Sequence, residues 1–186
     1  MKREIRDRNI LDKFAIDFCR IVEKHAPYIV VSGFVAISSG RVRGTEDIDL
    51  IMKPLTKEKF KAFDADLRKA GFKCMQSKDL GEIYSYLKDN LSVRYTYKDQ
   101  PLPEMEVKFA QDALDEYQLE TRKKLPETGL DLYFSSVEMN IAFKEEYLKS
   151  EKDLEDAKHL RLVYEGKFDE NEIRKIKELL KRLRLE

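Results

Sequence analysis

Residues 30–52 read VVSGFVAISSGRVRGTEDIDLIM, and this stretch decides the expected fold. Its second apolar segment carries Asp47 and Asp49 at alternate positions among isoleucine and leucine. Side chains at alternate positions of a strand point to the same side of a sheet. The two carboxylates are therefore expected on one face, while Ile48 and Leu50 point into the core.

Two carboxylates this close to each other need a physical explanation. They repel, and the repulsion raises the pKa of one of them. A divalent cation relieves that repulsion, and Mg²⁺ prefers one or two carboxylates together with water and the oxygens of a substrate phosphate. The alternative is that arginine or lysine neutralises both acids, or that they lie on a solvated edge. The acid pair alone does not separate these two interpretations.

The residues before the acid pair favour a phosphate site. Gly33 ends an apolar segment and opens a short helical one, so the Ser32–Gly33 turn is expected to expose backbone N–H groups to phosphate oxygens. An ordinary strand-to-helix turn also uses glycine. Arg41, Arg43 and Thr45 lie in the loop that follows. A strand, a glycine turn, a helix, a basic loop and an acidic strand together predict a site for phosphate and metal.

The segment SGRVRGTEDIDL resembles the signature of the nucleotidyltransferase superfamily, in the form found in AbiEii-like and minimal nucleotidyltransferases. Arg43, Thr45, Asp47 and Asp49 follow that pattern. The Gly-Gly or Gly-Ser pair of the family stands here in inverted order, as Ser32–Gly33. The resemblance implies that the two aspartates bind metal, and that the turn, Arg43 and Thr45 bind the nucleotide.

The family also has a third acid on a neighbouring strand, between apolar residues. The segment EMEVKFA offers Glu106, and Glu104 on the same face is the alternative. By resemblance, this acid helps to hold metal and activates the acceptor hydroxyl. A surface glutamate beside Lys108 on a half-exposed strand would give the same pattern.

The C-terminal part of the chain adds a weaker resemblance. AbiEii-like proteins carry a helix with an acid and a lysine, followed by a basic–acidic pair that begins another helix. Glu138, Lys144 and the pair Lys152–Asp153 occur in that order. The resemblance implies that Lys144 meets nucleotide phosphates and that Asp153 caps or orients the site. A pair of amphipathic helices with a charged outer face is the alternative.

Hydrophobic periodicity predicts an α+β fold of the nucleotidyltransferase-like α/β type. We expect a mixed sheet of about five strands flanked by helices, and a C-terminal helical module. The domains are predicted as a core over 1–134, which includes an N-terminal helix, and a helical module over 135–186. The strands are expected at 28–33, 47–52, 72–76, 91–97 and 104–110, with a further short one within 130–136. The helices are expected at 9–26, 57–70, 136–149, 151–165 and 170–185, with a helical turn near 79–88 and a helical start to 111–125.

Composition excludes some classes of protein and leaves others open. Lysine plus arginine equals aspartate plus glutamate, 36 each, so no overall charge favours nucleic acid or membrane. The charged share, 39%, is typical of thermophile surfaces. Cys19 and Cys74 lack metal-ligand spacing, and the charged N-terminus shows no apolar leader. We expect a cytoplasmic protein with reduced thiols and no membrane contact.

Three functional hypotheses follow. The first is a nucleotidyltransferase that uses two Mg²⁺ ions to move NMP from an NTP to a hydroxyl of RNA, protein or a small molecule. In one version it is the toxin of a toxin–antitoxin pair, with an antitoxin as partner. The second is a weak or inactive relative that binds nucleotide or RNA, which the inverted Ser-Gly and a third acid that is Glu favour. The third is an interaction protein that docks through its last helix.

Overall fold

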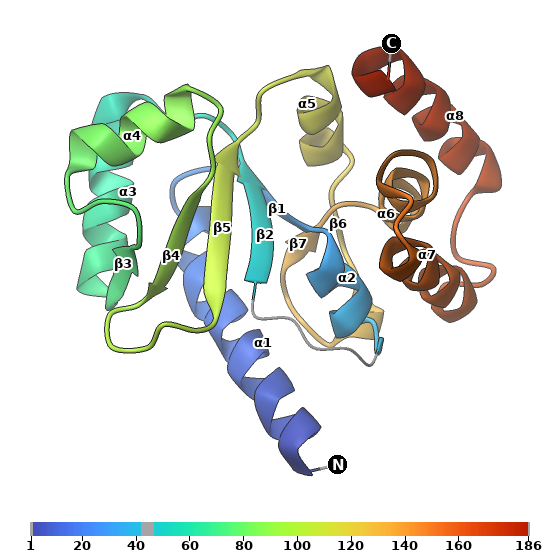
Figure 1. The fold of residues 1–186 in the computed structure, drawn as a ribbon, viewed down its shortest axis with the longest axis horizontal. Helices are drawn as coiled ribbons and strands as arrows, with labels where there is room; N and C mark the ends of the chain where they lie inside the picture. Colours follow the sequence, from blue (N-terminus) through green and yellow to red (C-terminus); the bar gives the residue numbers. More distant parts are fainter. Residues whose placement is uncertain (1, 42–46, 186) are drawn as a thin grey trace.

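The computed structural model describes residues 2–41 and 47–185, with the side chains of 10–41 and 47–185. Its centre is a mixed sheet of seven strands in the order β3-β4-β5-β2-β1-β7-β6 (Figure 1). Strands β2 and β5 are parallel, as are β1 and β7, and the other neighbouring pairs are antiparallel. The strands are β1 (Tyr28–Val31), β2 (Asp47–Met52), β3 (Phe72–Cys74), β4 (Val93–Tyr97), β5 (Glu104–Phe109), β6 (Lys123–Lys124) and β7 (Tyr133–Phe134).

Strands β2 and β5 bring the acidic segments of the sequence side by side. In their parallel register Asp47 lies opposite Glu104 and Asp49 opposite Glu106. The alternate residues of β2, Ile48 and Leu50, are buried in the main core. The alternation read from the sequence therefore holds on both strands, and their acids share one face.

Helices surround the sheet and lie beside both of its edges (Figure 1). Helix α1 covers the β3–β4 region, where Phe14 and Phe18 make edge contacts with Phe72, and Phe14 also contacts Tyr97. The α-helices are α1 (Lys2–Glu23), α2 (Gly33–Ser38), α3 (Lys57–Lys69), α4 (Leu80–Lys88), α5 (Ala113–Glu120), α6 (Val137–Phe143), α7 (Glu151–Val163) and α8 (Glu170–Leu180). Pro126–Thr128 forms a 3₁₀ turn, and Lys144–Leu148 and Lys181–Leu185 form π-helical turns that extend α6 and α8.

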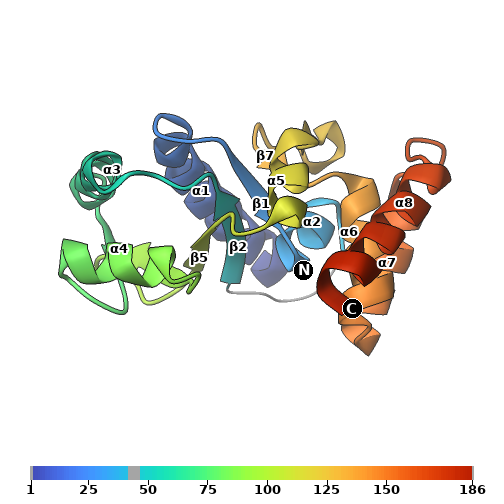
Figure 2. The same ribbon diagram turned by 90° about the horizontal axis from the view of Figure 1, so that it is seen from above.

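The three C-terminal helices lie together beyond α2, away from α3 and α4 (Figures 1 and 2). Polar contacts join α7 to the end of α2. The Ser39 hydroxyl lies 2.8 Å from the Tyr164 hydroxyl, and His159 Nε2 lies 3.1 Å from the Ser39 carbonyl oxygen. These contacts link the C-terminal helices to the segment that precedes the acidic strand. The domain boundary between residues 134 and 135 stays a prediction.

The α+β prediction is confirmed, but the strand count of about five was too low. Strand β6 consists of two lysines and enters the sheet only by backbone pairing with β7. Two residues carry no readable alternation, so the sequence gives no signal for such a strand. Near residue 80 the structure has a nine-residue helix in place of a single turn, because Asp79 caps it by accepting a hydrogen bond from the Glu82 N–H.

Cys19 and Cys74 are free thiols, and burial raises the pKa of each. A buried thiol with a raised pKa is a weak nucleophile, so neither is a candidate for chemistry. Within the described ranges, the helices are all too short or too polar to cross a membrane.

Candidate active site

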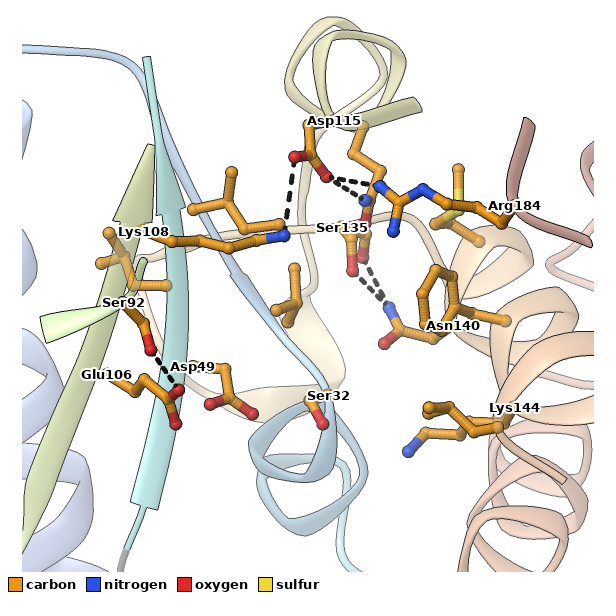
Figure 3. A pocket seen from close by; sticks show the side chains of 17 residues that line it. Ser32, Asp49, Ser92, Glu106, Lys108, Asp115, Ser135, Asn140, Lys144 and Arg184 are labelled. Atoms are coloured by element: carbon orange, nitrogen blue, oxygen red, sulfur yellow. Dashed lines mark hydrogen bonds and ion pairs between the residues drawn. The ribbon is translucent and has the colours of Figure 1, made fainter. Parts of the chain in front are cut away.

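A cavity of about 210 Å³ lies between the acidic face of the sheet and the C-terminal helices (Figure 3). Four predicted site residues line it: Ser32, Asp49, Glu106 and Lys144. Sites that enclose a drug-sized ligand measure about 300–1,000 Å³. This cavity is therefore smaller than a site that encloses a drug-sized ligand whole. The other lining residues are Val31, Leu50, Ile51, Ser92, Lys108, Asp115, Gln118, Ser135, Met139, Asn140, Phe143, Leu148 and Arg184.

Asp49 lies at the centre of the sheet side of the cavity. Its strand neighbours are Val31 on β1 and Glu106 on β5. Burial raises the pKa of Asp49 to about 6, and the neighbouring negative charge of Glu106 adds to this effect. A hydrogen bond from the Ser32 hydroxyl acts in the opposite direction. The folded protein therefore holds this carboxylate in its charged form at a cost in free energy, which a bound cation would offset.

Glu106 has partners of its own. The Ser92 hydroxyl donates a hydrogen bond of 2.6 Å to Oε1, and Arg94 Nη2 lies 3.7 Å from Oε2. The same guanidinium lies 3.6 Å from Glu104. The Arg94 side chain is 44% exposed, so solvent screens both pairs. The sequence alternative placed a neutralising arginine or lysine at the two aspartates, whereas Arg94 lies beside the two glutamates of β5.

Asp47 and Glu104 form a second pair, two residues nearer the start of each strand. Asp47 is exposed, and neither residue lines the cavity. Partial burial raises the pKa of Glu104 most, and a hydrogen bond with Asp47 and the negative charge of Asp47 raise it further. Of the two glutamates considered for the third acid, Glu106 faces the cavity with Asp49, and Glu104 pairs with Asp47 outside it.

Ser32 has an unusual backbone conformation. Its φ of 69° and ψ of −143° lie in a region that favours glycine and costs other residues free energy. The position where the resembled family has its first glycine thus keeps a glycine-like conformation here. Gly33 begins α2 and does not line the cavity, and α2 spans only six residues. Of this turn, the Ser32 side chain is what reaches the cavity.

Lys144 lies across the cavity from Ser32 (Figure 3). Its side chain is 2% exposed, with Nζ 3.2 Å from Asp156 and 3.6 Å from Asp153. Asp156 is fully buried and also pairs with Arg41 at 3.3 Å. A buried lysine keeps its charge when buried carboxylates compensate it. Lys144 is therefore a fixed cation on the helix side of the cavity.

A second group of charges, which the sequence did not predict, occupies the other end of the cavity. Lys108 Nζ lies 3.5 Å from Asp115, and Arg184 lies 3.5 Å from Asp115 and 2.7 Å from Asp112 (Figure 3). Strand β5 and helix α5 are neighbours in the chain, but Arg184 comes from the C-terminal turn, 69 residues after Asp115. Their convergence depends on tertiary packing, so no local pattern indicates it.

Two predicted nucleotide-binding residues, Arg43 and Thr45, lie outside the described residues. Over the ranges 2–41 and 47–185, no group of three or more His, Cys, Asp or Glu side chains is arranged to hold a metal ion. On the sheet side of the cavity the acids are Asp49 and Glu106, and the third acid that lines it, Asp115, pairs with Lys108 and Arg184 at the other end.

Comparison with known proteins identifies the fold. The antibiotic-resistance factor ANT(2'')-Ia matches over 94% of this chain and 92% of its own, with a TM-score of 0.56 and 14% identity. An antigenic nucleotidyltransferase-like protein from Paracoccidioides brasiliensis matches over 92% and 87%, with a TM-score of 0.53 and 17% identity. JHP933 from Helicobacter pylori matches over 97% and 75%, with a TM-score of 0.53 and 15% identity. The chain has a nucleotidyltransferase-like fold.

No protein-family model matches the sequence. No curated protein matches it either. At identities of 14–17% the structural matches establish the fold and leave the chemistry to the site itself.

Proposed function

We propose that this protein is a nucleotidyltransferase that moves NMP from an NTP to a hydroxyl acceptor, with magnesium as cofactor. The observation that carries the proposal is the position of Asp49 and Glu106. They lie side by side on parallel strands and face a cavity whose opposite wall carries the buried cation Lys144. The nucleotidyltransferase-like fold supports the same conclusion.

The two acids fit a magnesium ion by their chemistry. Mg²⁺ is bound by one or two carboxylates together with water and substrate phosphates, and it does not need an all-protein cage. Asp49 and Glu106 supply two carboxylates, and burial, followed by the negative charge of Glu106, raises the pKa of Asp49. By the resemblance Asp47, two residues before Asp49 on β2, is also a metal ligand, and a second ion would be shared with Glu106. Bound magnesium would neutralise charge that develops on the phosphates and on the acceptor oxygen.

The protein groups on the two walls of the cavity would position the triphosphate. The Ser32 hydroxyl, which donates to Asp49 in the protein alone, would turn to a phosphate oxygen once a cation neutralises that carboxylate, and the Lys144 ammonium supplies positive charge on the helix side. The acceptor hydroxyl would give its proton to a carboxylate of the site, its oxygen would form a bond to the α-phosphorus, the bond from that phosphorus to the β-phosphate oxygen would break, and pyrophosphate would leave. Holding the reactants in line is the main contribution of the protein in such a transfer.

The acceptor is RNA, a protein side chain or a small molecule, and the cavity itself does not select among them. In the toxin version of the proposal the acceptor is a cellular RNA or protein, and an antitoxin blocks the site. Overall charge is zero, so an RNA acceptor would bind through a local basic patch.

A nucleotide-binding module with little catalysis is the second candidate. Arg94 lies within ion-pair distance of both glutamates of β5, and Lys144 is bound to two aspartates. If these pairs persist with nucleotide present, the acids and the lysine lose part of their capacity to hold metal and phosphate. The protein would then bind nucleotide and release it unchanged.

Transfer of radiolabel separates the two candidates. The wild-type protein is incubated with each α-labelled NTP, Mg²⁺, and either total RNA or protein extract. Label in RNA, in protein or in the enzyme itself supports transfer, provided that Asp49→Asn and Glu106→Gln each reduce it by orders of magnitude. Asp99→Asn, an exposed aspartate between β4 and β5, is the matched control. NTP binding without transfer to any acceptor supports the module.

A further inference from the structure

Asn140 lines the cavity with a side-chain amide whose orientation is fixed. The residue is 4% exposed. Its Nδ2 donates to the Ser135 carbonyl at 3.1 Å, to the Ser135 hydroxyl at 2.7 Å and to the Ser136 carbonyl at 2.9 Å. Rotating the amide by half a turn would place Oδ1 against two carbonyl oxygens, which cannot donate. The amide nitrogen is therefore held on the side of Ser135 and Ser136.

This fixed orientation leaves Oδ1 on the other side of the amide. Figure 3 shows the amide nitrogen turned toward Ser135 and the oxygen directed away from it. In the part of the chain that the structure describes, Oδ1 of Asn140 accepts no hydrogen bond. Oδ1 is not among the fully buried side-chain atoms that lack a partner, so it is open to the cavity, where a donor can reach it. A hydrogen-bond donor on a ligand would satisfy it.

The position of Asn140 indicates which part of a nucleotide it meets. The Lys144 backbone N–H donates to the Asn140 carbonyl, so the two residues are one helical turn apart on the same face. Their Cβ atoms are then separated by about 6 Å. If Lys144 contacts the phosphates, the group one step farther along the nucleotide is the sugar. The exocyclic amino groups of the bases lie beyond the sugar and farther from Lys144.

We propose that the Oδ1 atom of Asn140 accepts a hydrogen bond from a hydroxyl of the nucleotide sugar, which makes Asn140 a residue that recognises the sugar. This inference rests on the proposed function, because it needs an NTP in the cavity. Only the donor side of the amide is used by the protein, so the acceptor side is available for recognition. A site built to bond a hydroxyl discriminates against an analogue that lacks it.

The first test uses the wild-type protein and changes only the ligand. Dissociation constants are measured by calorimetry with Mg²⁺ for ATP, GTP, CTP and UTP, and for the 2′-deoxy and 3′-deoxy forms of the tightest binder. Loss of one neutral hydrogen bond should weaken binding roughly three- to tenfold for one of the two deoxy forms. The form that binds more weakly identifies the hydroxyl. The Asn140 side-chain amide resonances should shift with the ribonucleotide and not with that deoxy form.

The second test changes the protein. Asn140→Ala removes the acceptor, and Asn140→Ser removes it while a serine hydroxyl can still bond the Ser136 carbonyl one turn earlier. Both variants should bind the ribo and deoxy forms with equal affinity. Asn171→Ala, an exposed asparagine in the first turn of α8, is the matched control and should discriminate as the wild type does.

The outcomes separate this inference from the proposed function. If the wild-type protein binds none of the four NTPs, both are wrong. If it binds an NTP and both of its deoxy forms equally, the proposed function stands and the role of Asn140 is overturned. Discrimination that persists in both Asn140 variants overturns that role as well, and so does an Asn140 amide resonance that responds equally to ribo and deoxy forms.

Discussion

Replacing Asp49 by asparagine should stabilise the folded protein at pH 8 while it removes any transferase activity. Asparagine has nearly the shape of aspartic acid and carries no charge. It would remove a carboxylate that the fold holds in a partly buried position beside Glu106. Catalytic residues are often destabilising in this way, because their environment is arranged for the ligand and not for the empty protein.

The pKa of Asp49 gives the magnitude. It is raised from the ordinary value of 3.8 to about 6 in the folded protein. Each unit corresponds to about 1.4 kcal/mol, so the upper limit is about 3 kcal/mol. Water in the cavity screens the charge, and we expect a gain of roughly 1–3 kcal/mol in the free energy of unfolding. For a protein of this size that is a rise of roughly 3–10 °C in Tm.

The effect should depend on pH in a defined direction. Because the pKa of Asp49 is higher in the folded state, the folded state holds the proton more tightly than the unfolded state. The contribution of Asp49 to stability therefore falls as the pH rises from about 4 to about 6, and the fall is complete above about 6. The advantage of Asp49→Asn should be largest at pH 8 and shrink as the pH falls toward 4.

The assay is urea unfolding with EDTA at pH 8 and at several values down to pH 4.5. The control Asp99→Asn, which removes one exposed aspartate, should stay within about 0.5 kcal/mol of the wild type. If Asp49→Asn is less stable than the wild type at pH 8, the Asp49 carboxylate is satisfied within the protein. The proposal that Asp49 and Glu106 form a cation-binding pair would then be refuted.

Three further substitutions test other parts of the site and its support. Lys144→Met should lower the free energy of unfolding by roughly 3 kcal/mol in urea, because buried Asp156 loses one of its cations; an unchanged stability would show that the pair is not needed. Ser32→Gly relieves the φ of 69° but removes the hydrogen bond to Asp49, so the free energy of unfolding should change by less than about 1 kcal/mol while NTP binding weakens in calorimetry. Tyr164→Phe should cost about 1 kcal/mol by thermal unfolding, because the Ser39 hydroxyl loses its partner, and no loss would contradict that bond.

The sheet side of the site could be predicted because its signal is local. Asp47 and Asp49 alternate with Ile48 and Leu50, and that period of two fixes which side chains share a face. Glu106 follows by the same argument on β5. Which of the two acid pairs meets the cavity depends on where the C-terminal helices pack. The alternation therefore indicates four candidate acids, and the packing of the C-terminal helices places the cavity at Asp49 and Glu106 and not at Asp47 and Glu104.

The helix side and the far end of the cavity were harder to predict. Asn140 was missed although it interrupts the apolar run VEMNIAF, which is a signal for a buried polar group. Arg184 meets Asp115 across 69 positions of the chain, and no periodicity indicates a contact of that range. The φ of Ser32 is likewise set by the sheet and α2 around it. A serine in the sequence does not indicate a backbone conformation that favours glycine.

A crystal soaked with Mn²⁺ and a non-hydrolysable NTP analogue tests the central claim most directly, because the anomalous signal of manganese locates the ion without assumptions. The account predicts an ion bound by carboxylate oxygens of Asp49 and Glu106 and by a phosphate oxygen, at distances of about 2.0–2.3 Å. A nucleotide bound elsewhere, or bound in the cavity without an ion at these two acids, would contradict it.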